Sequence, residues 1–77
     1  MSFYKPSSQK RLRKFFTSHN FTLSEGGEHT IAVHNLTGIK FVFPRHNTIS
    51  NGVTKKICDR LVSLGYDKDE IERKILS

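Results

Sequence analysis

The sequence predicts a single small α+β domain, in which two helices cover one face of a three-stranded antiparallel meander and a short helix follows at the C-terminus. Apolar residues recur at helical spacing toward both ends of the chain, and they alternate with polar residues in three short runs between. Turn-forming residues, including glycine, separate these runs. With 77 residues, the chain has no room for a second domain or for repeated βαβ units.

The first helix is predicted over residues 8–18, after a loose arm at residues 1–6. Ser7 or Ser8 is a suitable N-cap, because a serine hydroxyl accepts a hydrogen bond from an otherwise unpaired helix N–H. One apolar stripe at spacing i, i+3, i+4 is formed by Leu12, Phe15 and Phe16. Basic side chains surround that stripe, namely Lys10, Arg11, Arg13 and Lys14. The pattern predicts a helix that packs through one face and is positively charged elsewhere.

The first two strands are predicted over residues 20–25 and 28–34. Gly26 and Gly27 join them in a turn, since glycine adopts positive φ without penalty. In the second strand one face holds Ile31 and Val33, and the opposite face holds Thr30, Ala32 and His34. We expect the Ile31 and Val33 face to be packed and His34 to be a solvated surface histidine, because the outer face of such a sheet is usually polar.

The third strand is predicted over residues 39–43, after a turn at 35–38. Phe41 and Phe43 project together toward the helices, whereas Lys40 and Val42 project the other way. Pro44 ends the strand because proline has no N–H to donate.

The second main helix follows a polar connection at residues 45–50. Ser50 or Asn51 is its expected cap, and its core stripe consists of Val53, Ile57, Leu61 and Leu64. Gly65 stands where a C-terminal cap is expected. Asp67 and Glu70 then begin an extra C-terminal helix over residues 67–76, which should fold back onto the domain through Ile71, Ile75 and Leu76.

Charge and cysteine content narrow the classes of function. The net charge is +6, from 13 Lys and Arg against 7 Asp and Glu, which favours nucleic acid, an acidic protein or an anionic membrane surface as partner. No apolar run approaches a membrane span, and the first residues lack the apolar stretch of a secretory signal. A lone Cys58 excludes an internal disulfide and a cysteine-rich zinc site. A reduced, cytoplasmic setting without membrane attachment is therefore expected.

The four histidines do not predict a metal site, and nothing in the sequence calls for a cofactor. His29 and His34 lie five residues apart in one strand and so point to opposite faces. No acidic or cysteine cluster completes a ligand set. His19, in the turn after the first helix, is most simply a cation at the helix C-terminus.

His29 is the candidate for proton transfer. His29 has the same position in the strand alternation as Ile31 and Val33, which predicts that it faces the packed side. It is, however, at the start of its strand, directly after a glycine turn. A histidine has an unperturbed pKa of about 6.5 and exchanges protons near neutrality. The residues leave two interpretations open: a general acid or base, or a partly buried histidine with one backbone hydrogen bond.

Two groups of residues are candidates for binding phosphate. Arg45 and His46 follow the last strand and precede a helix N-terminus, which attracts anions, although an ordinary polar loop fits equally well. The other group lies on the two helices, Lys10, Arg11 and Lys14 on the first and Lys55, Lys56 and Arg60 on the second. With few compensating carboxylates, both helices favour a polyanion. The phenylalanines are needed for the core, which argues against base stacking.

The order of elements is shared with double-stranded-RNA-binding domains, and several motifs are more specific. In order these are Asn20-Phe21-Thr22-Leu23, Gly27-Glu28-His29, Gly38 in the second turn, Pro44-Arg45-His46, and Asn51-Gly52-Val53-Thr54. Over about residues 7–65 this succession resembles the HicA toxins, small mRNA interferases of toxin–antitoxin systems. Glu28 stands where that family usually has serine, and Thr30 where a second histidine is common.

The resemblance implies a double-stranded-RNA-binding-domain-like fold, endoribonuclease activity on mRNA without a metal, and a HicB-type antitoxin as partner. It places His29 at the position of the family's catalytic histidine. Two other functions remain open at this stage. One is a non-catalytic RNA-binding module, and the other is a degenerate toxin that only docks an acidic protein.

Overall fold

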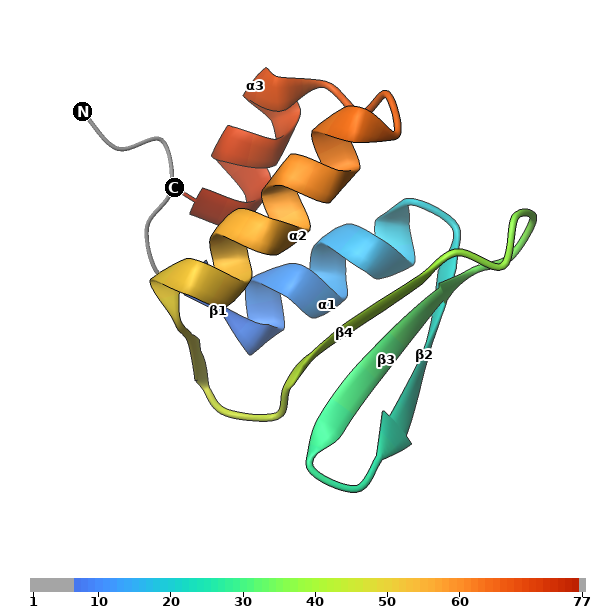
Figure 1. Cartoon of the computed structure of the whole chain (residues 1–77), viewed down its shortest axis with the longest axis vertical. Helices are drawn as coiled ribbons and strands as arrows, with labels where there is room; N and C mark the ends of the chain where they lie inside the picture. The colour runs from blue at the N-terminus through green and yellow to red at the C-terminus, as the bar shows by residue number, and fades with distance from the viewer. Residues whose placement is uncertain (1–6, 77) are drawn as a thin grey trace.

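The computed structural model describes residues 7–76, so the arm expected at residues 1–6 lies outside the described residues. The α+β class and the α-β-β-β-α order are confirmed, with a short C-terminal helix added (Figure 1). In chain order the elements are β1 (Ser7–Ser8), α1 (Gln9–Ser18), β2 (Phe21–Gly26), β3 (His29–His34), β4 (Lys40–Pro44), β5 (Thr48–Ile49), α2 (Asn51–Ser63), α3 (Lys68–Ile71) and the π-helical turn η1 (Glu72–Leu76).

The main sheet is the predicted antiparallel meander, in the order β2-β3-β4. Its first hairpin is tight, because Gly26 pairs with His29 and Gly27 adopts a φ of +63°. On its other side, His29 pairs with Pro44, the last residue of β4. The first residue of the central strand therefore lies between the ends of both neighbouring strands.

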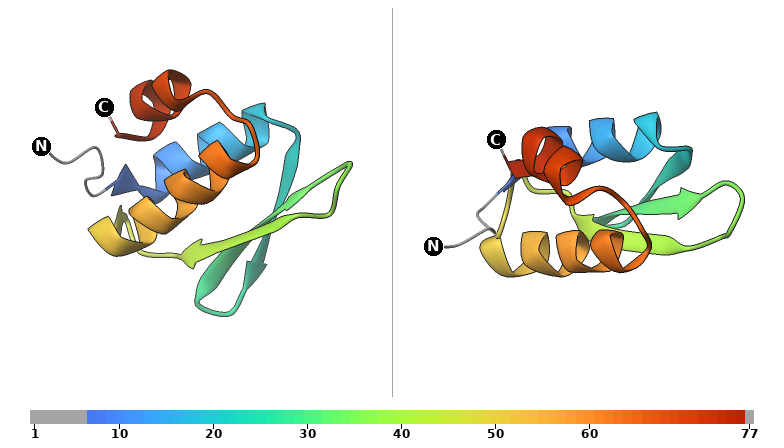
Figure 2. Two further views of the ribbon diagram at one scale, coloured as in Figure 1. Left: turned by 45° about the horizontal axis from the view of Figure 1, so that its top comes forward. Right: turned by 90° about the horizontal axis from the view of Figure 1, so that it is seen from above.

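The helices gather on one side of this sheet, as Figure 1 and the left-hand view of Figure 2 show. Phe41 and Phe43 are buried beneath them, as predicted. The ring centroid of Phe16 on α1 lies 5.1 Å from that of Phe41 and 5.8 Å from that of Phe43. From α2, the Arg60 guanidinium stacks over the Phe41 ring at 4.7 Å. Both main helices thus contact the aromatic face of β4.

The face assigned to β3 from the sequence is wrong. Thr30 and Ala32 are fully buried against the helices, whereas His29 is exposed on the outer face. The register explains this, since Thr30 pairs with Phe43 and Ala32 pairs with Phe41. Small side chains on β3 leave room for the large rings beside them, and burial of larger side chains there would overpack the layer.

A second, two-stranded sheet was not anticipated. β1 pairs antiparallel with β5, with Ser7 opposite Ile49, and the Ile49 side chain is fully buried. The backbone N–H of Gln9 also donates to the carbonyl of Asn47 at 3.1 Å. These contacts tie the start of α1 to the connection that precedes α2. Strands of two residues carry no periodicity, which is why the sequence pattern does not reveal them.

The second half of the chain largely follows the expected signals. The Ser50 hydroxyl caps α2, and Gly65 follows α2 with a φ of +99°, a conformation that glycine accepts without strain. The core stripe differs at its ends: the buried face comprises Thr54, Ile57, Cys58 and Leu61, and Leu64 is 42% exposed. No helix among residues 7–76 is long and apolar enough to cross a membrane.

The C-terminal helix folds back onto the domain as expected. The Asp67 side chain caps α3 by accepting a hydrogen bond from the N–H of Asp69 at 3.1 Å. Ile71 and Ile75 are fully buried, whereas the side chain of Leu76 lies outside what the structure describes. This helix therefore belongs to the same core as α1 and the sheet.

Burial of the β4 rings should dominate the stability of so small a domain. We expect Phe41→Ala to lower the free energy of unfolding by about 3–5 kcal/mol, because it removes a ring that packs against α1 and α2. Val42→Ala on the neighbouring, 53% exposed position should cost less than about 1 kcal/mol. Urea denaturation of both variants makes the comparison, and equal losses would show that the strand register is wrong.

Candidate active site

His29 lies exposed at one end of the sheet, on its outer face. The backbone N–H of Arg45 donates to the carbonyl of Glu28 at 3.1 Å, so the segment after β4 runs beside the β2–β3 loop. A shallow open depression of about 310 Å³ is lined there by Gly27, Glu28, Arg45 and His46. Of the residues singled out in the sequence, Arg45 and His46 line this depression, and His29 directly follows its lining residue Glu28 in the chain.

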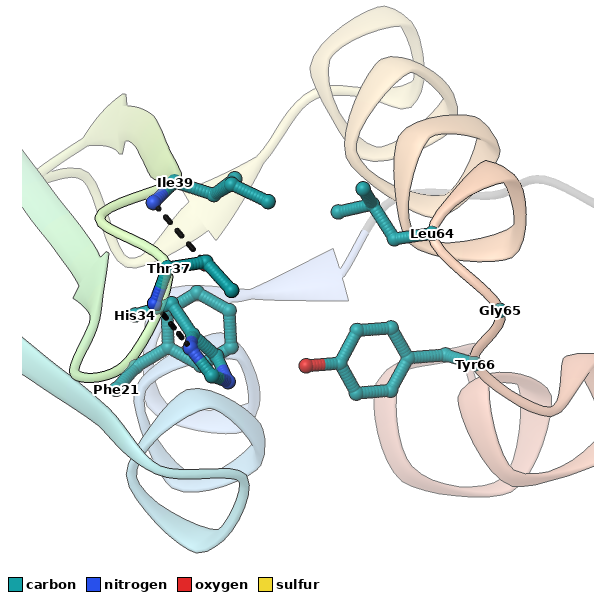
Figure 3. Close-up of a pocket in the computed structure, with 7 residues that line it drawn as sticks. All are labelled: Phe21, His34, Thr37, Ile39, Leu64, Gly65 and Tyr66. Atoms are coloured by element: carbon teal, nitrogen blue, oxygen red, sulfur yellow. Dashed lines mark hydrogen bonds between the residues drawn. The ribbon is translucent and has the colours of Figure 1, made fainter.

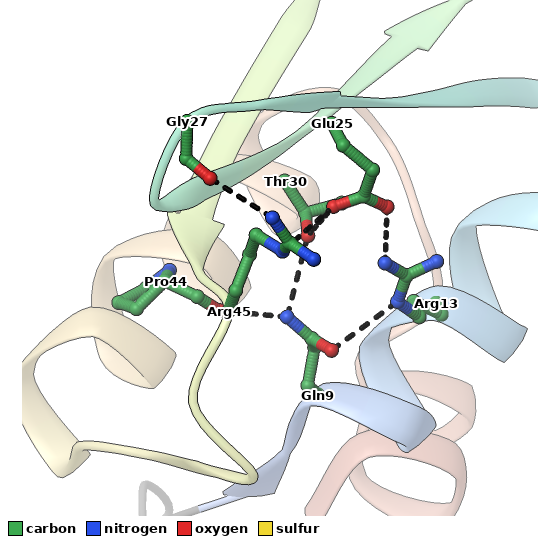
Figure 4. A network of polar contacts seen from close by, with 7 residues as sticks. All are labelled: Gln9, Arg13, Glu25, Gly27, Thr30, Pro44 and Arg45. Carbon is green, nitrogen blue, oxygen red and sulfur yellow. Dashed lines mark hydrogen bonds and ion pairs between the residues drawn. The ribbon is translucent and has the colours of Figure 1, made fainter.

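The Arg45 guanidinium is held in place by the strands beside it (Figure 4). Its Nε lies 3.2 Å from Glu25 Oε1, and its Nη1 donates to the carbonyl of Gly27 at 2.9 Å. An arginine has five N–H donors, and the Arg45 side chain is about half exposed. N–H groups beyond those two contacts therefore remain for an anion in the depression.

Glu25 is the centre of this network, and sequence reasoning did not select it as a functional residue. Its carboxylate also pairs with Arg13 of α1 and accepts a hydrogen bond from the Thr30 hydroxyl at 3.1 Å. The pKa of Glu25 lies below its ordinary value, chiefly because Arg13 donates to it, with smaller contributions from Thr30 and from the charge of Arg45. A signal was present in the sequence, since Glu25 shares the core-facing parity of Phe21 and Leu23.

Gln9 connects the first turn of α1 to the same end of the sheet. Its amide nitrogen donates to the Pro44 carbonyl at 3.1 Å and to the Thr30 hydroxyl at 3.3 Å. Its amide oxygen accepts from Arg13 Nε at 3.3 Å. The helix start, the β2–β3 hairpin and the end of β4 are therefore joined by one set of hydrogen bonds, which fixes the position of the depression (Figure 4).

The other predicted phosphate-binding residues lie on the two helices. Lys10, Arg11 and Lys14 are exposed on α1 and line one groove. Lys55 and Lys56 are exposed on α2, where Lys55 Nζ lies 3.0 Å from Asp59 Oδ2. Phosphate binding by these residues stays a prediction, and the structure places them on surfaces separate from the depression beside His29.

His34 is not the solvated histidine expected. It packs edge-on against Phe21, with 4.9 Å between ring centroids, and lines a pocket of about 350 Å³ with Ile39, Leu64 and Tyr66 among others (Figure 3). Its Nδ1 accepts from the backbone N–H groups of residues 36 and 37, at 3.2 and 3.3 Å. The neutral ring therefore carries its proton on Nε2. Its role is to hold the β3–β4 turn.

His19 ends α1, as predicted, and links it to α3. Its Nδ1 lies 2.8 Å from the carbonyl oxygen of Phe15, and its Nε2 lies 3.2 Å from Glu70 Oε2. Both neighbours are acceptors, so both ring nitrogens donate when both bonds form, which describes the imidazolium. The pKa of Glu70 lies below its ordinary value, first because Lys74 donates to it and then because of the positive charge of His19.

Cys58 does not contribute to the depression. Cys58 is buried, and burial raises the pKa of its thiol to about 11, so the thiolate is not populated near neutral pH. Within residues 7–76, no three or more His, Cys, Asp or Glu side chains gather as possible metal ligands.

Comparisons of the chain with protein families, with curated proteins and with solved structures found no match.

The ion pairs of Glu25 predict a specific acid sensitivity. Its pKa is depressed in the folded state, so its contribution to stability is present above the ordinary value of 4.5 and is lost as the pH falls through the folded-state pKa. Glu25→Gln should therefore be less stable than the wild type near neutral pH, and the two should converge in acid. Urea denaturation between about pH 7 and about pH 3 measures the difference.

Glu28→Gln is the matched control, because it removes a carboxylate from the same hairpin without touching the Glu25 network. It should follow the wild-type pH dependence. A Glu25→Gln variant that parallels the wild type over the whole range would show that the ion pairs contribute nothing to stability.

Proposed function

We propose that this protein is a metal-independent endoribonuclease acting on mRNA, the toxin of a HicA-type toxin–antitoxin pair, with His29 as its proton-transfer residue. The single observation that supports this most is the position of His29. It is exposed, and it opens β3 at the end of the sheet where Arg45 and His46 line a depression. A histidine that exchanges protons and an oriented guanidinium that binds phosphate are the two kinds of group that metal-free RNA cleavage requires of a protein.

In the proposed reaction the substrate supplies its own nucleophile. His29 removes the proton from a ribose 2′-hydroxyl, and O2′ attacks the adjacent phosphorus. The bond from phosphorus to O5′ breaks, and O5′ leaves with a proton from a general acid. His46, which lines the depression, is the candidate acid.

Arg45 would stabilise the charge that develops on the phosphoryl oxygens. Its position is set before substrate arrives, because Glu25 and the Gly27 carbonyl hold two sides of the guanidinium. A donor that is already oriented stabilises a transition state without reorganisation at the moment of reaction. The partnership has an electrostatic cost, since the Glu25 carboxylate offsets part of the positive charge.

A second candidate function is supported by Glu28. Its carboxylate is exposed in the loop residue directly before His29, and Glu28 lines the depression itself. A negative charge there repels a phosphodiester from the depression, which favours a protein that binds RNA through its other basic surfaces, or docks an acidic antitoxin, without cleaving RNA. Under either function we propose a cytoplasmic location and a HicB-type acidic partner, which suits a chain of net charge +6.

Substitution of His29 separates these functions. We expect His29→Ala to lower RNA cleavage by about 10²–10⁴-fold, the usual contribution of general acid–base catalysis. RNA binding and the free energy of unfolding should stay near wild type, because the side chain is exposed and contributes little packing. Cleavage of a labelled RNA with purified protein, with and without a chelator, measures the effect, and the chelator should change nothing.

Two comparisons make that experiment specific. An oligonucleotide with deoxyribose at every position should resist cleavage, because it lacks the 2′-hydroxyl. Glu28→Ser should leave cleavage equal or faster, because it removes a negative charge from the depression. Full activity in folded His29→Ala would reject the assignment, and wild-type protein that binds RNA but never cleaves it would favour the second function.

A further inference from the structure

A basic groove runs between α1 and η1, separate from the depression beside His29. Its cationic lining comes from both helices, Lys10, Arg11 and Lys14 on α1 and Arg73 and Lys74 on η1. The groove has a volume of about 570 Å³, and Ser8, Phe15 and Ser18 complete its lining. The sequence pattern indicated only the α1 side, because the packing of η1 beside α1 is a tertiary contact. The right-hand view of Figure 2 shows the two segments next to each other.

The C-terminal helix is fixed along α1 at both ends. Near the start of α1, the Ser7 hydroxyl donates to the Ile75 carbonyl at 2.5 Å. At its end, His19 Nε2 lies 3.2 Å from Glu70 Oε2. Between these contacts, Ile71 and Ile75 are buried in the core. The second wall of the groove is therefore part of the folded domain, and its backbone is fixed beside α1.

The groove is strongly positive. α1 contains no acidic residue anywhere between Gln9 and Ser18, and its N-terminus adds the positive end of the helix dipole. On η1, Lys74 Nζ lies 3.0 Å from Glu70 Oε2, so one of the cations is partly neutralised. The cations of α1 and of η1 line one concave surface.

The chemistry of the lining favours a phosphodiester backbone over a protein. Protein interfaces are centred on buried aromatic or aliphatic anchors. The large exposed hydrophobic side chains of the described residues are Leu36, Val42, Val62 and Leu64, and none of them lines this groove. Its one aromatic residue, Phe15, is 1% exposed and belongs to the core. A polyanion backbone needs only cations, which the groove supplies.

We propose that this α1–η1 groove binds the phosphodiester backbone of a single RNA strand without regard to sequence, with Arg73 and Lys74 as binding residues. Sequence independence follows because cations that contact phosphate oxygens carry no sequence information. Among the residues that line the groove, no exposed aromatic ring is present for bases to stack on. This proposal extends the proposed function and relies on it for the choice of RNA as the bound polyanion. In this proposal the C-terminal helix binds the RNA substrate at a surface distinct from the cleavage site.

The test is binding of a labelled, unstructured RNA across a salt series, by fluorescence anisotropy, in the His29→Ala background so that the strand stays intact. With about five phosphates contacted, the log–log slope of affinity against salt should be on the order of −3.5. Arg73→Glu should weaken binding by about 5-fold or more at low salt and flatten the slope by about 0.7. Arg11→Glu, on the opposite wall, should behave alike.

Lys40→Glu is the matched control, because it makes the same change in net charge at an exposed position outside the groove. It should weaken binding by less than about 2-fold. Equal effects of Arg73→Glu and Lys40→Glu would overturn the proposal. The proposal would also be overturned if polyglutamate bound as tightly as RNA and lost affinity to the same extent in Arg73→Glu. That result would assign the groove to an acidic protein. Binding that follows the expected pattern without wild-type cleavage would contradict the proposed function alone.

Discussion

The packing of Phe16 into the aromatic cluster of the sheet is the contact on which the rest of the structure depends. Its ring centroid lies 4.8 Å from that of Phe21 and 5.1 Å from that of Phe41, so one residue of α1 contacts both outer strands of the meander. With α1 fixed in this way, Gln9 reaches the Pro44 carbonyl and Arg13 reaches Glu25. The fixed positions of the residues around the depression are thus a consequence of core packing in a thin domain.

Two groups of cations in the chain occupy different environments. Beside His29, Glu25 holds Arg13 and Arg45 in fixed positions, which orients donors but neutralises part of their charge. In the groove between α1 and η1, Lys10, Arg11 and Lys14 face Arg73 and Lys74, and Glu70 pairs with Lys74. The cations of the groove suit retention of a long polyanion. The oriented, partly neutralised guanidinium of Arg45 suits one phosphate at a reacting bond.

Local signals in the sequence predicted much of the fold, and features that depend on packing partners were missed. Ser50 as a cap, Gly65 at positive φ and the burial of Phe43 follow from residue type and spacing. The packed face of β3 did not, because Thr30 and Ala32 are buried to make room for rings on other strands, a matter of volumes and not of hydropathy. The same holds for the site: His29 was identified from its motif, whereas for Glu25 the sequence offered only its core-facing parity. The partners of Glu25 and the η1 wall of the groove depend on tertiary contacts.

The ends of the cleaved RNA test the account most directly. A short RNA of defined sequence is incubated with the wild-type protein in excess chelator, and the products are analysed by mass spectrometry. Attack by the 2′-hydroxyl predicts a 2′,3′-cyclic phosphate on the upstream fragment and a free 5′-hydroxyl on the downstream fragment. A 5′-phosphate paired with a 3′-hydroxyl, or intact RNA in the presence of folded protein, would contradict a metal-independent ribonuclease centred on His29.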